Sequence, residues 1–220
     1  MSAGPDPGFA ARGTADGREP SGVRPEDRPA SAVSPEVAAL LRAQLRGRVA
    51  VMGVGNPLRG DDAVGSIVAR KLQRAFAWVP PAAADDPDVT TVAIVDAEEI
   101  PESYLGVLCA ARPAVVVLVD AADVGCAPGS VVLVDGSRLA DHASSTHRTP
   151  LAPVARYLER RTGARVLLAG IQPGPERWGD GLSGAVEDTA NRLSNILWDA
   201  LRAGRAESPE KAWTPEAPVC

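Results

Sequence analysis

Five short apolar runs, rich in Val, Leu and Ala, alternate along this chain with segments of helical periodicity. They are RVAVMGV (48–54), VTTVAIV (89–95), AVVVLVD (114–120), SVVLVD (130–135) and ARVLLAG (164–170). Apolar runs of this length without polar alternation are typical of strands that are buried on both faces. The pattern predicts a three-layer α/β domain, with a mixed, mostly parallel, five-stranded sheet and helices on both faces.

One connection in this pattern is too short for a parallel crossover. The fourth run follows the third after only nine residues, 121–129. A parallel crossover needs about a dozen residues or more, so the fourth strand is predicted to be antiparallel. Helices are predicted near residues 35–45, 64–76, 101–111, 151–158 and 186–201.

The two ends of the chain differ from its middle in composition. Residues 1–34 are rich in Pro, Gly, Arg, Asp and Ser without apolar periodicity, and residues 205–220 have a similar character. Both segments are predicted to be disordered tails, which leaves residues 35–204 as a single α/β domain. The N-terminus carries no hydrophobic signal core, so a cytoplasmic protein is expected.

Charge and cysteine content argue against several classes of function. The formal net charge of -5 argues against nucleic acid or an anionic membrane as a partner. No apolar run reaches the roughly 18 residues that a membrane span needs. Three widely spaced cysteines form neither a disulfide framework nor a Cys-x-x-Cys metal site.

The loop after the first strand, GVGNPLRGDDAVG (53–65), has the glycine content of a phosphate-binding loop. A dinucleotide fingerprint needs a third glycine three positions after Gly55, where this chain has Leu58. The spacing from Gly55 to Gly60 fits a P-loop, but two aspartates replace the Lys and Ser/Thr. Carboxylates repel phosphate, so the sequence disfavours nucleotide binding.

Asp61 and Asp62 each have two interpretations. An aspartate at a helix start can accept backbone N–H bonds and interact with the helix dipole, and capping accounts for both residues when they are taken alone. Together with other ligands, one of them can instead contact a cation.

Asp120 and His147 complete a possible ligand set. Asp120 directly follows an apolar strand, where a charge must be paired, hydrated or metal-bound. It could equally cap the following turn. The chain has two histidines, His142 and His147, and His147 stands closer to a helix start. A loop histidine is often only a solvated surface residue, but two carboxylates with one imidazole suit Zn, Ni, Mn or Fe with open coordination positions.

These residues resemble a known family, the endopeptidases that mature the large subunit of nickel–iron hydrogenases. The resemblance runs from about Val49 to Leu201 and rests on four blocks in order: GVGNPLRGDDAVG, VVLVDAADVGCAPG, STHRTPL and GIQP. The last two blocks are closest to the branch that serves hydrogenases of the formate-hydrogenlyase type.

The resemblance implies both an activity and its site. By position, Asp62, Asp120 and His147 correspond to the metal-contacting, catalytic residues of the family, which leaves Asp61 as the predicted helix cap. The enzyme is expected to remove a C-terminal extension from the hydrogenase large-subunit precursor after nickel insertion. Nickel would arrive with the substrate and serve as a recognition element, and no other cofactor is expected.

The substrate path is expected to lie near Gly55, Asn56 and Asp96. Gly53, Gly55 and Asn56 are expected to shape a turn that lets the backbone approach the substrate tail. Asn56 could instead satisfy its own turn backbone. Where many relatives carry an Asp-Gly-Gly-like turn, this chain reads VDAEEIPES, with Asp96 keeping the acid.

Two alternatives stay open beside this interpretation. One is a cysteine hydrolase in which Cys126 is the nucleophile and His147 the base, oriented by Asp120 or Asp123. The other is a non-catalytic α/β binding or regulatory module of hydrogenase assembly.

Overall fold

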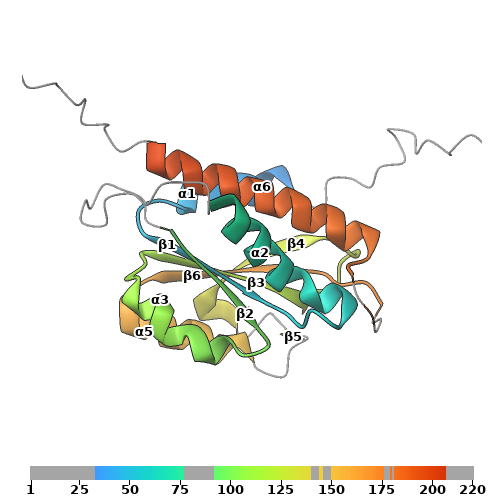
Figure 1. Ribbon diagram of the computed structural model, residues 1–220, viewed down its shortest axis with the longest axis horizontal. Helices are drawn as coiled ribbons and strands as arrows, with labels where there is room; N and C mark the ends of the chain where they lie inside the picture. Colours follow the sequence, from blue (N-terminus) through green and yellow to red (C-terminus); the bar gives the residue numbers. More distant parts are fainter. Residues whose placement is uncertain are drawn as a thin grey trace, which may run out of the picture. The chain divides into compact units, whose positions relative to one another are not determined.

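The fold is built on one twisted sheet, shown in Figure 1. The computed structural model describes residues 33–76, 92–139, 144–145, 150–175, 179 and 181–206. The strand order is β2-β1-β3-β6-β4. The strands are β1 (Val49–Val54), β2 (Val92–Glu98), β3 (Val115–Asp123), β4 (Val131–Asp135) and β6 (Arg165–Ile171).

Strand directions confirm the mixed, mostly parallel sheet. β1 is parallel to β2 and to β3, and β3 is parallel to β6. β4 is antiparallel to β6, as its short connection predicted. A two-residue strand, β5 (Ser144–Ser145), pairs antiparallel with the end of β3.

Helices cover both faces of the sheet (Figure 1). On one face lie α1 (Pro35–Gln44), α2 (Val64–Phe76) and α6 (Gly184–Ala206). On the other lie α3 (Leu105–Ala110) and α5 (Leu151–Thr162). Short 3₁₀ helices complete the described structure: η2 (Gly60–Ala63), η3 (Pro101–Tyr104) and η4 (Gly136–Arg138). Among the described helices, none combines the length and apolar character that crossing a bilayer requires.

The central strand β3 contributes to two separate cores. Val117 and Val119 pack in the core under α1, α2 and α6, whereas Val116 and Leu118 pack in the core under α3 and α5. Successive side chains of a strand point to opposite faces. The same alternation places Asp120 on the α3/α5 side of the sheet.

Glycines let α2 lie unusually close to the sheet. A Cβ added to Gly53 of β1 would come 2.0 Å from the carbonyl oxygen of Gly65 in α2. A Cβ on Gly65 would come 2.1 Å from the carbonyl oxygen of Val119 in β3. Gly53 therefore permits close helix–sheet packing, and its expected part in the turn toward the substrate stays a prediction.

The boundaries of several predicted elements shift. β2 and β3 each extend three residues past their expected ends, to Glu98 and Asp123, because their neighbours continue to pair there. The helix expected over 101–111 is split into η3 and α3.

The packed structure also begins before the expected tail boundary at residue 34. Val33 is buried in the core, and the Ser34 hydroxyl accepts from the backbone N–H of Val37 as the N-cap of α1. Residues 1–32 and 207–220, which make up most of the two predicted tails, lie outside the described residues.

Candidate active site

Four loops leave the sheet at its C-terminal edge, which is the edge formed by the carboxyl ends of the parallel strands β1, β2, β3 and β6. Gly53 of β1 lies opposite Asp96 of β2 on one side and Val119 of β3 on the other. Asp120 of β3 lies opposite Gly170 of β6. Ligand sites of open α/β sheets occur outside the carboxyl ends of the strands, so this edge is the candidate site.

Asp120 lies inside β3 rather than at its end, which corrects the sequence-based placement. The register of β1 with β3 stops at Val119, while β6 pairs on to Ala121 and β5 pairs with Ala122. The Asp120 side chain is fully buried, with 0% exposure. An ionised carboxylate is costly at such a position unless hydrogen bonds or a cation compensate its charge.

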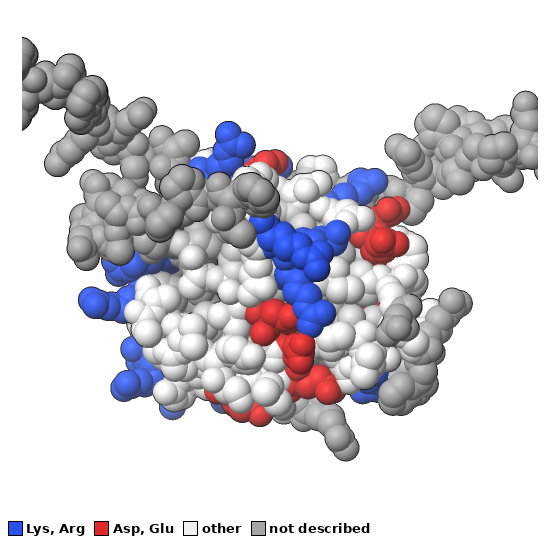
Figure 2. Space-filling model, viewed as in Figure 1, with Lys and Arg blue, Asp and Glu red and all other residues white. Residues whose placement is uncertain are grey.

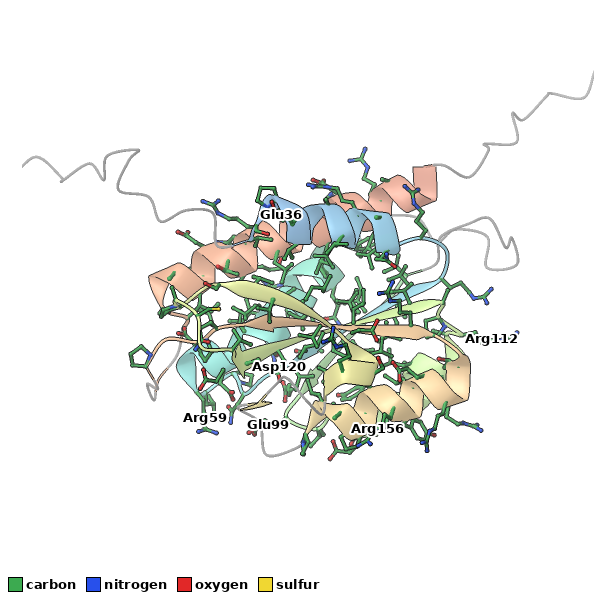
Figure 3. All side chains as sticks on the ribbon, turned by 180° about the vertical axis from the view of Figure 1, so that it is seen from behind. Glu36, Arg59, Glu99, Arg112, Asp120 and Arg156 are labelled. Carbon is green, nitrogen blue, oxygen red and sulfur yellow. The ribbon has the colours of Figure 1, made fainter. Side chains whose placement is uncertain are left out.

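Asp62 reaches the same edge from the helix entrance after β1. It lies in η2, which packs against β3, the strand that carries Asp120. Its Oδ2 accepts the backbone N–H of Asn56 at 3.3 Å, and its side chain is half-buried. Figure 3 labels Asp120 and Arg59, the residue that precedes η2, in the same lower-left part of the view. The structure thus brings the elements of two predicted site carboxylates together.

The third predicted ligand, His147, lies outside the described residues, as does His142. Within the described ranges, no three His, Cys, Asp or Glu side chains are arranged to hold a metal ion. The described part of the predicted site therefore consists of Asp62 and Asp120.

The turn after β1 is held by one hydrogen bond within the turn and one to the end of β2. Asn56 Oδ1 accepts the backbone N–H of Leu58 at 2.8 Å, so the turn role left open by the sequence is present. Gly55 donates its N–H to the carbonyl of Glu98 at 2.9 Å. A Cβ on Gly55, whose φ is +157°, would come 2.3 Å from the carbonyl oxygen of Asp62. Glycine at this position therefore lets the turn close over η2.

Asp96 is held by the helix beside it. Its Oδ1 accepts from the buried hydroxyl of Ser66 at 2.5 Å, and its Oδ2 accepts from Nε of Arg70 at 2.5 Å. The hydrogen bond to Asp96 raises the pKa of Arg70 above its ordinary value. Arg70 also contacts Glu98 at 2.7 Å. Over α2 and the end of β2, Figure 2 shows basic side chains meeting acidic ones. These contacts tie the β2 edge to α2.

Glu98 adopts a backbone conformation that usually favours glycine. Its φ is +47°, in the left-handed region, where a residue with a Cβ costs roughly 1 kcal/mol more than glycine. The VDAEEIPES turn therefore contains a glycine-like conformation without a glycine. Glu98 is held in this conformation by the ion pair of its side chain with Arg70 and by the bond from its backbone N–H to Asp96 Oδ1.

Asp61 does not cap its own helix, contrary to the prediction from the sequence. The residue before η2, Arg59, makes no side-chain cap bond, and Asp61 points to a distant segment. Its carboxylate accepts from the N–H and hydroxyl of Ser183 and from the N–H of Gly174. No local signal could have identified these partners, because they lie more than a hundred residues away.

Gln172 belongs to the GIQP block, and the structure shows what this residue contacts. It directly follows β6, and its Oε1 accepts the backbone N–H groups of Val124 (2.8 Å) and Cys126 (3.3 Å). Its own backbone N–H and C=O bond to Ser130 and Gly129. Gln172 thus shapes the loop after β3, in which Cys126 is exposed to solvent.

Comparisons with known proteins show the family to which the chain belongs. The HycI family model, described as hydrogenase maturation protease, matches residues 67–200. The hydrogenase 3 maturation protease of Escherichia coli K12 is 30% identical over 123 residues, which are 54% of this chain and 69% of that protein.

Solved structures show the same fold. A crystal structure of a NiFe hydrogenase maturation protease from Thermococcus kodakarensis superposes with a TM-score of 0.63 at 33% identity, covering 74% of this chain and 99% of that one. A solution structure of an endopeptidase from Escherichia coli gives 0.55 at 25% identity, covering 69% and 90%. Sequence and fold therefore lead to one assignment: the chain belongs to the hydrogenase maturation protease family, whose members are peptidases.

Proposed function

We propose that this protein is the endopeptidase that removes the C-terminal extension of a nickel–iron hydrogenase large-subunit precursor once nickel has been inserted. The observation that carries the proposal is the fully buried carboxylate of Asp120 on β3, with η2 and its Asp62 packed against the same strand. Because the chain belongs to a family of peptidases, we assign this pair of acids to the catalytic site.

His147 enters this proposal through the STHRTPL block, which resembles the corresponding block of the family.

Nickel enters this reaction as part of the substrate. We propose that Asp62, Asp120 and His147 add two carboxylates and an imidazole to a nickel ion already held by thiolates of the precursor. Such donors suit nickel. The bound ion would orient the scissile peptide and polarise its carbonyl as a Lewis acid. A water oxygen then bonds to the carbonyl carbon, the C–N bond breaks, and the released amine takes the proton.

The substrate tail is proposed to run along the loops after β1 and β2. Gly55 and Asn56 form the first of these loops, and the Gly55 N–H bond to Glu98 joins it to the second. Asp96 lies beneath both, where its contacts with Ser66 and Arg70 favour a supporting role. The similarity to a hydrogenase 3 maturation protease supports the formate-hydrogenlyase-type branch as the source of the substrate.

Cleavage of two matched precursors tests this function. Purified protein is mixed with nickel-loaded and nickel-free large-subunit precursor, and the C-terminus is read by mass spectrometry. Shortening of the nickel-loaded form alone is the expected result. Shortening of neither form contradicts the endopeptidase proposal, whereas shortening of both contradicts only the role of nickel in recognition.

A further inference from the structure

Asp61 joins two loops of the candidate site that are far apart in sequence. Its Oδ1 accepts the backbone N–H of Ser183 at 2.6 Å. Its Oδ2 accepts the Ser183 hydroxyl and the backbone N–H of Gly174, each at 2.8 Å. These three bonds link η2, which carries Asp61 and Asp62, to the segment that leads from β6 to α6.

The far end of this link is anchored in the core. Ser183 accepts the N–H of Glu187 at 2.8 Å through its carbonyl oxygen and so begins α6. α6 has 23 residues, and its apolar side packs in the core with β3 and α2. A second contact joins the same two loops, because Gly60 donates to the carbonyl of Gly179 at 3.2 Å. Asp61 therefore holds η2 against a rigid support.

Asp62 is the next residue in the same short turn. Its backbone N–H donates to the carbonyl of Arg59 at 3.1 Å, and its Oδ2 accepts from Asn56 at 3.3 Å. A 3₁₀ turn of four residues cannot shift at Asp61 without moving Asp62. We propose that Asp61 is a positioning residue that fixes the Asp62 carboxylate for its contact with the substrate nickel. This inference rests on the proposed function and deepens it.

The hydrogen-bond donors around Asp61 suit a carboxylate group of this size. All three bonding groups around it are donors, and a carboxylate is a pure acceptor, whereas an amide would turn its own NH₂ group toward a donor. The space is also filled, because a Cβ on Gly174 would come 3.0 Å from Asp61 Oδ2. Both Asp61→Asn and Asp61→Ala should therefore release the turn.

Asp135 provides a matched control. It also accepts from the N–H (3.2 Å) and hydroxyl (2.7 Å) of a serine, Ser137. It lies opposite Leu167 of β6, three positions before the Gly170 that faces Asp120, and so belongs to the other end of the sheet. Asp135→Ala removes serine bonds of this kind, together with the ion pair to Arg165 (3.2 Å), without touching the candidate site.

The test measures kcat and KM for the nickel-loaded precursor, together with the melting temperature of each variant. Since a misplacement of about 1 Å can cost roughly a hundredfold, Asp61→Ala is expected to lower kcat by ten- to a hundredfold. KM should change by less than about threefold, because most of the precursor surface is unaffected. Ser183→Ala, which removes one of three bonds, should show a smaller loss, and Asp135→Ala should leave kcat within about twofold.

A kcat for Asp61→Ala within twofold of wild type, beside a normal wild-type rate, overturns the inference and leaves the proposed function intact. A kcat loss in Asp135→Ala as large as that in Asp61→Ala overturns it as well, since both would then reflect stability alone.

Hydrogen exchange gives a readout that does not depend on cleavage. Amides of residues 56–66 should exchange faster in Asp61→Ala, while amides of 131–139 should not. Unchanged exchange at 56–66 contradicts the positioning role even if the wild-type protein cleaves neither precursor, an outcome that would contradict the proposed function separately.

Discussion

Arg70 of α2 donates from Nε to the Oδ2 of Asp96 in β2 over 2.5 Å, and the buried Ser66, one helical turn earlier, donates to the other carboxylate oxygen. A single acid at the edge of the candidate site is thus held by two side chains of one helix. These contacts join the edge strand β2 to the helix α2 that covers it, so their loss is expected to lower the stability of the fold.

Ser66→Ala should lower the free energy of unfolding by about 1–3 kcal/mol, because it removes a buried donor from an ionised acceptor. Urea denaturation measures the change. Ser137→Ala is the control: its hydroxyl also donates to an aspartate, but in an exposed position, so a loss of less than about 1 kcal/mol is expected. Equal losses in the two variants would contradict the supporting role of Ser66.

Asp96→Asn separates support from substrate binding. A supporting Asp96 predicts a lower melting temperature with a KM for the precursor within about twofold of wild type. An unchanged melting temperature with a strongly raised KM would instead assign Asp96 to the substrate contact.

Asp120→Asn keeps the shape of the buried side chain and removes its charge. Cleavage of the nickel-loaded precursor should fall by roughly a hundredfold or more, the order seen when one group that stabilises a transition state is removed. Circular dichroism should show a folded protein at the assay temperature. Cleavage at the wild-type rate would exclude Asp120 from the reaction.

Gly53→Ala tests the close packing of α2 on the sheet. The added Cβ would lie 2.0 Å from the carbonyl oxygen of Gly65 and 2.7 Å from the Cβ of Ala69. Relief of this overlap requires the helix to move, so a loss of about 3 kcal/mol or more is expected in urea denaturation. Gly106→Ala is the control, since nothing lies within 4 Å of its new Cβ in α3. There alanine should be neutral or should stabilise by up to about 1 kcal/mol.

Asp135 gives the unfolding equilibrium a defined acid dependence. The pKa of Asp135 lies below its ordinary 3.8, first because the Ser137 side chain donates to it. A carboxyl group whose pKa is lowered by folding stabilises the protein above its ordinary pKa, and this contribution is lost as the pH falls through the folded-state value. Asp135→Asn should lower the melting temperature at pH 7 and reduce its decline below about pH 4.

Glu159 is expected to change the pH dependence of stability in the direction opposite to Asp135. Burial, and then the negative charge of Asp135, raise the pKa of Glu159 above its ordinary 4.5. The contribution of Glu159 to the free energy of unfolding is therefore fully present below pH 4.5 and is lost as the pH rises through its folded-state pKa. Glu159→Gln should remove this loss and raise the melting temperature at pH 7 relative to wild type. Parallel pH profiles of all three proteins would contradict both assignments.

Alkylation distinguishes the metal-assisted reaction from the cysteine hydrolase alternative. Cys126 is exposed, and its Sγ contacts the carbonyl of Val124 at 3.7 Å. Complete labelling of Cys126 by iodoacetamide, followed by peptide mass spectrometry, should leave the cleavage rate within about twofold. Loss of cleavage in proportion to labelling would favour a thiol nucleophile.

Much of the fold was predictable because buried elements have recognisable apolar patterns in short stretches of the sequence. Strands covered on both faces read as apolar runs, and the nine residues between β3 and β4 were too few for a parallel crossover. The order of the motif blocks was likewise enough to indicate the protease family. These features depend on residues close together in the chain.

The tertiary structure decided which groups surround each acid of the site. Asp96 follows an apolar run and Asp120 ends one, whereas Asp61 stands at a predicted helix start. Their surroundings differ because the neighbouring groups are distant in the chain: Ser183 for Asp61, Ser66 and Arg70 for Asp96, and the paired strand β6 for Asp120. A hydrogen bond requires atoms within about 3 Å, and only the packing of α2 and α6 on the sheet determines which donors come that close.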